Sequence, residues 1–259
     1  MPRAPGLCRG LLPQEGCPGS RWMNSLQGKR ALVTGGSAGI GRAIAAQLVA
    51  GGAQVAIAAR TQSVLESAAL ELGATPIVAD LSSAQAASQL AAEALDKLGG
   101  LDVLVLSSGI YLEGNITALA ARDLSDLLGA NVIGPTALAK NLVPALVASQ
   151  GDVLIINSSI VRAQNIAGRA YYAAGEQAMK AIADGLRDEI NALGVRVTSI
   201  YPGTTATPRQ ERRHRTAGKQ YQPERLLQPS DVALMALAAL CLPSTAEATD
   251  IYVRPRLKS

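Results

Sequence analysis

The most distinctive chemical feature of the sequence is a glycine-rich segment, Thr34–Gly41, which directly follows a short apolar run. Glycines permit a tight turn and a close backbone approach to a phosphate, and a helix that begins there points its free N–H groups at the anion. An ordinary turn between a strand and a helix is the alternative. Because the segment joins the first predicted strand to the first predicted helix, we favour a pyrophosphate-binding turn made by Gly35, Ser37, Ala38, Gly39, Ile40 and Gly41.

A second candidate position is Arg60, at the end of the second predicted strand. An acidic side chain at this point would bind the ribose 2′-hydroxyl of NAD and repel the 2′-phosphate of NADP. Arg60 can instead form charge-assisted hydrogen bonds to that phosphate. The alternative is a solvated arginine that opens a helix. The sequence therefore favours NADP(H) as the cofactor.

These residues can act together only if the elements around them form a sheet. Short apolar runs predict strands at Arg30–Thr34, Gln54–Ala58, Thr75–Ala79, Asp102–Leu106, Asp152–Asn157, Val195–Ile200 and Asp250–Val253. Longer runs between them predict helices at Ile40–Ala50, Ser63–Leu72, Ala84–Leu98, Ala121–Ala148, Ala170–Leu193 and Ser230–Leu240. Strands with apolar centres that alternate with helices are typical of parallel strands covered on both faces. We predict an α/β fold: a single doubly wound Rossmann-type domain with a mainly parallel seven-stranded sheet.

The composition excludes several classes of protein. The chain has 259 residues, of which 48% are hydrophobic, and a formal net charge of +4. This excludes global disorder, and charges, Gly or Pro break every run of about 18 apolar residues, so we expect no membrane span. Cys8, Cys17 and Cys241 lack the spacing of a metal site, and His214 is the only histidine. We expect no metal and a cytoplasmic protein in a reducing compartment.

The positive charge is concentrated in two segments. Residues 1–22 carry a net +2 and residues 209–225 a net +4, which leaves the rest of the chain at −2. Because only Tyr221 interleaves with the basic residues, we expect no nucleic-acid partner. Residues 1–24 are predicted to be a disordered N-terminal extension, with Met23 as a possible true start and an import leader as the alternative. Residues 25–259 are predicted to be one NADP-binding domain.

Several motifs, in order along the chain, resemble those of the short-chain dehydrogenase/reductase family. Thr34-Gly35-x-x-x-Gly39-x-Gly41 resembles the family's cofactor motif, and Ser107-Ser108-Gly109 stands where the family usually has Asn-Ala-Gly. The resemblance runs from about Gly28 to Pro255. Beyond the glycine-rich turn, the cofactor-binding set that it implies is Arg60, Asp80, Leu81, Ser108, Gly109, Tyr172, Glu176, Pro202, Gly203, Thr205 and Thr207.

The resemblance also implies a catalytic Ser, Tyr and Lys. Tyr172 has Ser159 thirteen residues upstream, as the family pattern requires. Ser158 does not have this spacing from Tyr172, and Tyr171 fits the pattern less well. Four residues after Tyr172, where the resemblance implies lysine, the chain has Glu176. The implied catalytic set is Asn131, Ser159, Tyr172 and Glu176.

Glu176 changes the chemistry that this set can perform. Residues four apart share a helix face, so we expect Glu176 to lie beside Tyr172. At about 5 Å and an effective dielectric constant of about 20, its charge is worth about 3 kcal/mol, or about two pKa units of the tyrosine. Tyr172 would then remain protonated, which suits a proton donor and not a base. Lys180 either pairs with Glu176 or is a solvated surface residue, and Met179 occupies the position of the lysine in enoyl reductases.

These residues predict an NADPH-dependent oxidoreductase that reduces a ketone or aldehyde to an alcohol, slowly or with a bias toward reduction. By resemblance, Ser159 would polarise the carbonyl, Tyr172 would donate the proton and Asn131 would hold a relay water. The alternative is a catalytically impaired NADP(H)-binding or sensor protein of the same fold.

The segment after Thr207 is expected to face the substrate. The resemblance implies a mobile lid, and the net charge of +4 over residues 209–225 would attract an anionic substrate. A solvated flexible loop that includes His214 is the favoured alternative. The helices predicted at 121–148 and 170–193 resemble family helices that pair between subunits, which implies a homodimer or homotetramer.

Overall fold

The structure is a computed structural model that describes residues 26–257. Seven strands form one sheet in the order β3-β2-β1-β4-β5-β6-β7, and every neighbouring pair is parallel. The strands are β1 (Arg30–Thr34), β2 (Gln54–Ala59), β3 (Thr75–Val78), β4 (Val103–Leu106), β5 (Asp152–Ile156), β6 (Arg196–Pro202) and β7 (Asp250–Val253). The predicted α/β fold is confirmed. The predicted N-terminal extension, residues 1–24, lies outside the described residues.

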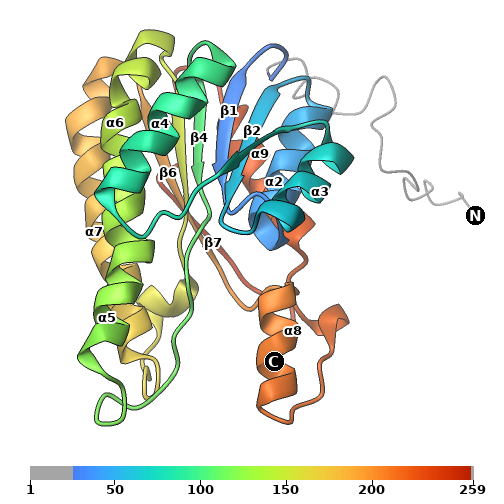
Figure 1. Ribbon diagram of the computed structural model, residues 1–259, viewed down its shortest axis with the longest axis vertical. Coiled ribbons are helices and arrows are strands. Elements are labelled where there is room, and N and C mark those ends of the chain that lie inside the picture. Colours follow the sequence, from blue (N-terminus) through green and yellow to red (C-terminus); the bar gives the residue numbers. More distant parts are fainter. Residues whose placement is uncertain (1–25, 258–259) are drawn as a thin grey trace, which may run out of the picture.

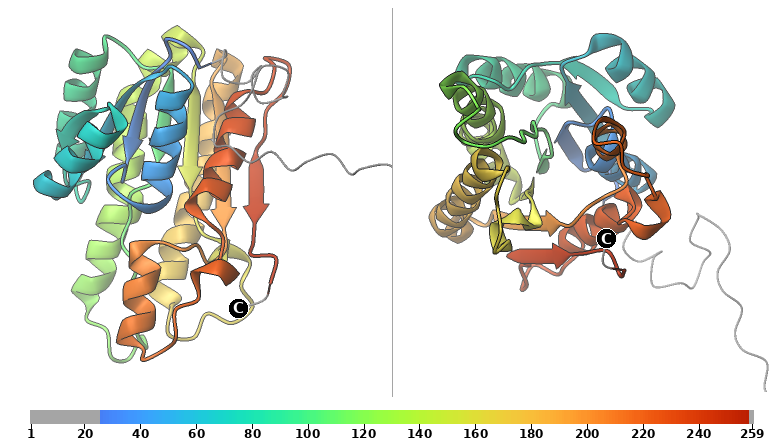
Figure 2. Two further views of the ribbon diagram at one scale, coloured as in Figure 1. Left: turned by 90° about the vertical axis from the view of Figure 1, so that its right-hand side faces the viewer. Right: turned by 90° about the horizontal axis from the view of Figure 1, so that it is seen from below.

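Helices cover both faces of this sheet (Figures 1 and 2). One face is covered by α2 (Gly39–Ala50), α3 (Gln62–Leu72) and α9 (Pro229–Leu240), and the other by α4 (Ala84–Leu98), α6 (Gly134–Ser149) and α7 (Ala170–Ile190). Leu32 packs into the core below one set of helices, and its neighbour Val33 packs below the other. Because successive strand residues point to opposite faces, both must be apolar, as the sequence pattern predicted.

The helix predicted at Ala121–Ala148 is interrupted. It consists of α5 (Ala121–Leu128), a π-helical segment η1 (Gly129–Ile133) and α6. A Cβ at Gly134 would lie 1.9 Å from the carbonyl oxygen of Leu81, so the helix passes unusually close to the β3–α4 loop. This close approach holds the irregular turn beside the carboxyl ends of the strands.

The same helical segment, Ala121–Ser149, is long and apolar enough to cross a membrane by length and composition. Its residues Leu138, Leu142 and Leu146 are fully buried in the core beside the sheet. This burial is the pattern of a core helix in a folded domain.

The segment after β6 differs from its prediction. A solvated flexible loop was favoured there, but residues Pro208–Thr216 form a helix, α8. Thr207 caps it by accepting a hydrogen bond from the Gln210 amide at 3.3 Å, and Pro208 occupies the first turn. The loop prediction was wrong because this helix has no apolar stripe to reveal its period. His214 is therefore a helical residue, with its Nδ1 2.9 Å from the Gln210 carbonyl oxygen.

Three short 3₁₀ turns complete the described secondary structure, namely η2 (Ser159–Arg162), η3 (Asn191–Leu193) and η4 (Pro223–Arg225).

The strand order changes direction at β1, which lies between β2 and β4. Chain segments that leave neighbouring strands in opposite directions open a crevice at the carboxyl ends of the strands, where ligands bind in open α/β sheets. In Figure 1, α5 and α8 project beyond this edge on its two sides.

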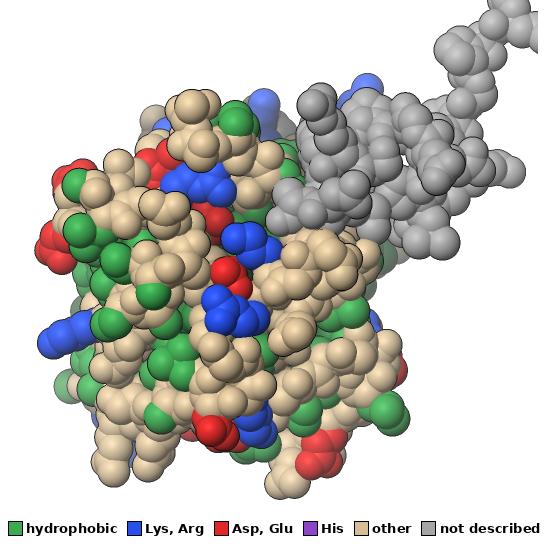
Figure 3. Space-filling model, turned by 90° about the horizontal axis from the view of Figure 1, so that it is seen from above, with side chains coloured by type: hydrophobic (Ala, Val, Ile, Leu, Met, Phe, Trp, Pro, Cys, Tyr) green, Lys and Arg blue, Asp and Glu red, His purple; other side chains and the backbone are tan. Residues whose placement is uncertain are grey.

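The opposite end of the sheet carries paired charges. Arg30 Nε lies 2.8 Å from Asp102 Oδ2, and Arg196 Nε lies 2.7 Å from Asp152 Oδ1, at the starts of neighbouring strands. Figure 3 views this end and shows basic and acidic side chains interleaved across it. Among the described residues, both of these arginines thus have an acidic partner at the amino ends of the strands.

Candidate active site

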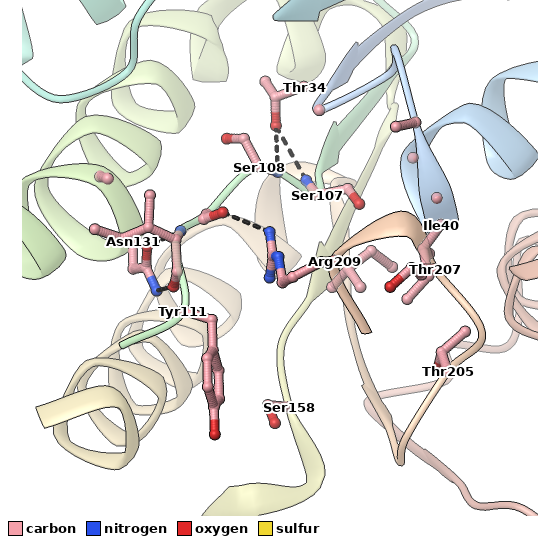
Figure 4. Close-up of a pocket in the computed structure, with 18 of the residues that line it drawn as sticks. Thr34, Ile40, Ser107, Ser108, Tyr111, Asn131, Ser158, Thr205, Thr207 and Arg209 are labelled. Carbon is pink, nitrogen blue, oxygen red and sulfur yellow. Dashed lines mark hydrogen bonds between the residues drawn. The ribbon is translucent and has the colours of Figure 1, made fainter. Parts of the chain in front are cut away.

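A cavity of about 700 Å³ lies at the carboxyl ends of the strands. It is lined by the turn after β1, the ends of β2 to β6, the π segment, the start of α7 and the first turn of α8 (Figure 4). All the predicted site residues line it: Gly35, Ser37, Ala38, Gly39, Ile40, Gly41, Arg60, Asp80, Leu81, Ser108, Gly109, Asn131, Ser159, Tyr172, Glu176, Pro202, Gly203, Thr205 and Thr207. The structure therefore brings the predicted set to one place.

The glycine-rich turn is shaped for close contact with an anion. Gly35 and Gly39 have φ angles of +67° and +56°, which favour glycine, and a Cβ at Gly41 would lie 2.5 Å from the carbonyl oxygen of Gly35. Ala38 occupies the N-cap of α2 and provides no side-chain cap. The first N–H groups of α2 therefore face the cavity without a side-chain acceptor, and the turn fits a pyrophosphate.

The end of β4 forms the floor of the cavity. Thr34 Oγ1 accepts hydrogen bonds from the amides of Ser107 at 3.0 Å and Ser108 at 3.2 Å, and so ties β4 to β1. The Ser108 hydroxyl is buried and has no hydrogen-bond partner among the described residues. A buried hydroxyl of this kind is expected to bond to a ligand or to water. The Ser-Ser-Gly sequence thus offers a polar group to a ligand in the cavity.

The far end of the cavity is open to solvent. Arg60 and Asp80 are exposed on its rim, at the ends of β2 and β3, while Leu81 is buried. Among the described residues, Arg60 forms no ion pair, so its guanidinium is free to meet an anion. This arrangement fits a 2′-phosphorylated adenosine lying across the rim.

Asn131 holds the π segment against the cavity floor. Its side-chain amide donates to the Ile110 carbonyl at 2.9 Å, and its Oδ1 accepts from the Ile110 amide at 2.7 Å. The same amide nitrogen lies 3.4 Å from Glu176 Oε1. Asn131 therefore links the segment after β4 to the acidic residue on α7.

Tyr172 and Glu176 occupy successive turns of α7 at the bottom of the cavity. Glu176 is only 8% exposed, and burial raises its pKa to about 7, against the opposing effects of Asn131, Arg209 and Tyr172. Burial, reinforced by the charge of Glu176, also holds the pKa of Tyr172 well above its ordinary range. Both side chains therefore tend to keep their protons. The sequence had anticipated a charged Glu176 and had not anticipated its burial.

The serine beside Tyr172 differs from the one chosen by spacing. The Ser158 hydroxyl accepts a hydrogen bond from the Ile160 amide at 3.3 Å and opposes the rise in the pKa of Tyr172. The Ser159 side chain lines the same cavity, and its hydroxyl has no hydrogen bond to another described residue. The two hydroxyls therefore have different surroundings, and that of Ser159 is available to a ligand.

Lys180 does not pair with Glu176. Its Nζ lies 2.8 Å from Asp184 Oδ2 and 3.8 Å from Asp250 Oδ1. The suggested Glu176–Lys180 pair is wrong because Asp184, one turn further along α7, gives the lysine a more accessible partner. No positive charge from α7 thus compensates Glu176.

The segment that leads into α8 forms another wall of the cavity. Gly203 donates from its amide to the Val253 carbonyl at 2.7 Å, directly after Pro202, and Thr205 Oγ1 donates to the Gly203 carbonyl at 2.9 Å. A Cβ at Gly39 would lie 3.2 Å from Thr207 Cγ2, so the start of α8 lies against the glycine-rich turn.

Three residues at this end were missed by sequence reasoning, namely Tyr111, Arg209 and Arg213. The Arg209 Nη2 donates to the Gly109 carbonyl at 2.6 Å, across the cavity. The Arg213 guanidinium lies 4.2 Å from the centre of the Tyr111 ring, which packs edge-on against Tyr172 at 4.8 Å. A high density of arginines was the available signal, but it did not indicate which of them would face the cavity.

Comparison with known proteins places this geometry in a family. The sequence model of the short chain dehydrogenase family matches residues 29–218. The chain belongs to the short-chain dehydrogenase family. The match includes every candidate catalytic residue and the glycine-rich turn. It therefore covers the first six strands of the sheet and the cavity described above.

Relatives of known sequence or structure agree with this family. An uncharacterized oxidoreductase of Staphylococcus aureus (strain MRSA252) is 31% identical over 236 residues, which is 90% of this chain and 100% of the relative. A short chain dehydrogenase from Burkholderia cenocepacia, solved with NADP, is 29% identical with a TM-score of 0.75 and covers 89% of this chain and 98% of its own. A variant of the actinorhodin polyketide ketoreductase, solved with NADPH, is 26% identical with a TM-score of 0.78, over 87% and 95% of the two chains.

Proposed function

We propose that this short-chain dehydrogenase is an NADPH-dependent reductase that converts a ketone or aldehyde to an alcohol. The observation that carries the proposal is the pair of half-buried Tyr172 and buried Glu176, which lines the same cavity as the glycine-rich turn. Tyr172 keeps its proton at neutral pH, as a proton donor for carbonyl reduction must, and Glu176, with a pKa of about 7, is protonated below that pH.

The cavity supports NADP(H) in particular. The amides of the α2 N-terminus would hold the pyrophosphate, Ser108 and Thr207 would lie along the nicotinamide half, and Arg60 would bind the 2′-phosphate. NADP and NADPH occupy two of the structural relatives. When bound, the cofactor supplies the hydride, and the residues of this chain orient the carbonyl and provide the proton.

The proton chemistry follows from the protonation of Glu176. Ser159, whose hydroxyl has no hydrogen-bond partner among the described residues, would polarise the carbonyl, and Ser158 would orient the Tyr172 phenol. As the carbonyl carbon gains hydride, Tyr172 gives its proton to the oxygen. If Glu176 were ionised, this step would leave two negative charges in a buried site, which costs about 3 kcal/mol at 5 Å and a dielectric constant of about 20. Protonated Glu176 instead passes its proton to the phenolate, so only one negative charge remains, and solvent restores the acid.

The pH dependence tests this mechanism. We expect kcat/KM for reduction to fall as pH rises through about 7, because Glu176 then loses its proton. In Glu176→Gln this inflection should disappear, and the remaining rate should be lower and independent of pH in that range. A Glu176→Gln enzyme with an unchanged inflection would show that another group controls the reaction.

Cofactor choice is tested separately by direct binding measurements. Arg60→Glu should weaken NADPH binding by about 100-fold, since it replaces a charge-assisted contact with repulsion. NADH, which lacks the 2′-phosphate, should bind within a few-fold of its wild-type affinity. Equal losses for both cofactors would instead assign Arg60 a structural role.

A second candidate function is an NADP(H)-binding protein without turnover. The observation that favours it is Glu176 itself, which stands where the family resemblance implies lysine, with no α7 cation to compensate it. NADPH binding with no reduction of any carbonyl would support this alternative.

A further inference from the structure

The arginine that reaches into the cavity from α8 has no counterpart in the roles assigned above. Arg209 lies in the first turn of α8 and donates to the Gly109 carbonyl at 2.6 Å. Figure 4 shows its side chain crossing from the side of Thr207 toward Asn131. It thus bridges two walls of the cavity.

Arg209 does not stabilise its own helix. Cations are unfavourable near a helix N-terminus, where the dipole is already positive, and favourable near the C-terminus. Among the described residues, Arg209 has no carboxylate within ion-pair distance, in contrast to Arg213, whose Nη2 lies 2.8 Å from Glu113 Oε2. Its charge therefore remains uncompensated and faces the cavity.

The position of α8 relative to the catalytic pair is fixed by several contacts. At its base, Ala206 donates from its amide to the Leu227 carbonyl at 2.7 Å, and Leu227 donates to the Thr204 carbonyl at 3.1 Å. At its other end, Arg213 lies over Tyr111, and Tyr111 packs on Tyr172. These contacts place a cation from α8 beside residues of α7.

The charged and titratable groups around Tyr172 and Glu176 come from three elements. Tyr172 and Glu176 lie on α7, Tyr111 on the segment after β4, and Arg209 on α8. Arg213 pairs with Glu113 and Lys180 with Asp184, whereas Arg169 and Arg212 line the same cavity and form no ion pair with another described residue. Arg209 is the cation whose field acts on both Glu176 and Tyr172.

We propose that Arg209 is a positioning residue that supplies, from α8, the positive charge that α7 lacks. It stabilises the single negative charge that remains on Tyr172 and Glu176 when their proton is transferred. Proton transfer then depends on α8 lying across the cavity, because only in that position does the cation reach the pair. The inference builds on the proposed function, but the effect of Arg209 on Glu176 exists whether or not a substrate is turned over.

The test is an infrared titration of Glu176 in the full chain without substrate. The carbonyl stretch of the protonated carboxyl group is followed against pH, and the spectrum of Glu176→Gln in the same background is subtracted. Arg209→Gln should raise the pKa of Glu176 by roughly half to one unit, because a partly solvent-screened cation is lost. Arg209→Lys should restore the wild-type value.

The direction of the shift separates a charge effect from a structural one. If Arg209 merely kept the cavity closed, its loss would hydrate Glu176 and lower the pKa. Arg215→Gln removes one positive charge from the exposed last turn of the same helix, outside the cavity lining, and is the matched control, which should leave Glu176 unchanged. A lowered or unchanged pKa in Arg209→Gln, or equal shifts in both variants, would overturn the proposal. Because no turnover is measured, a failed reductase assay leaves this result interpretable.

Discussion

At the residue scale, the Glu176 side chain determines the acid–base chemistry of the site. Glu176 stands four residues after Tyr172, and this spacing alone predicted that the two would share a helix face. The spacing could not reveal that Glu176 is buried and hydrogen-bonded to Asn131, because both depend on the packing of η1 against α7. Burial changes the expected role of Glu176 from a fixed negative charge to an acid that titrates near neutral pH.

The burial of Glu176 makes a prediction about stability. Its pKa is raised from 4.5 to about 7 in the folded protein, so the folded state holds a proton that the unfolded state releases. The associated stability is fully present below about pH 4.5 and is lost as pH rises through about 7. Relative to Glu176→Gln, the wild type should therefore lose up to about 3 kcal/mol of unfolding free energy over that range.

Urea unfolding at intervals between pH 5 and pH 8 measures this difference. Glu189→Gln, which removes an exposed carboxylate from the same helix, is the matched control and should show no comparable trend. A constant difference between wild type and Glu176→Gln would mean that Glu176 is hydrated in the folded protein.

At the element scale, regular structure was predictable and irregular structure was not. The seven strands and the helix Ala84–Leu98 follow from hydrophobic pattern and turn residues. The π segment that carries Asn131 gives no local signal, since it arises from the close packing of Gly134 on Leu81. Helix α8 was missed for a different reason: its arginines face the cavity and solvent, so no apolar period marks it.

The phosphate-binding turn makes a prediction at this scale. In Gly41→Ala the new Cβ would lie 2.5 Å from the carbonyl oxygen of Gly35, so the turn must open. We expect NADPH affinity to fall by at least 10-fold with the fold retained, as measured by calorimetry. Gly185→Ala, in the open interior of α7, should leave affinity unchanged and raise stability by about 0.5–1 kcal/mol. Wild-type affinity in Gly41→Ala would show that the turn does not hold the cofactor.

At the scale of the whole molecule, the sheet order explains why distant residues meet. Asn131, Tyr172 and Arg209 come from elements that follow different strands, and parallel strands bring their carboxyl ends to one edge. The motif order along the chain was enough to predict that Asn131 and Tyr172 would meet there, but not that Arg209 would join them. The choice between Ser158 and Ser159, and the contribution of α8, depended on side-chain directions that no spacing rule contains.

The central claim is that Tyr172, supported by protonated Glu176, donates the proton for carbonyl reduction. The most direct test is NADPH oxidation at pH 6.5 over a panel of ketones, aldehydes and quinones, with wild type, Tyr172→Phe, Tyr171→Phe and Glu176→Lys compared. We predict turnover by wild type and Tyr171→Phe, and a loss of at least about 100-fold in Tyr172→Phe. Turnover by Glu176→Lys alone would contradict the account and identify the natural protein as one that binds NADP(H) without reducing these substrates.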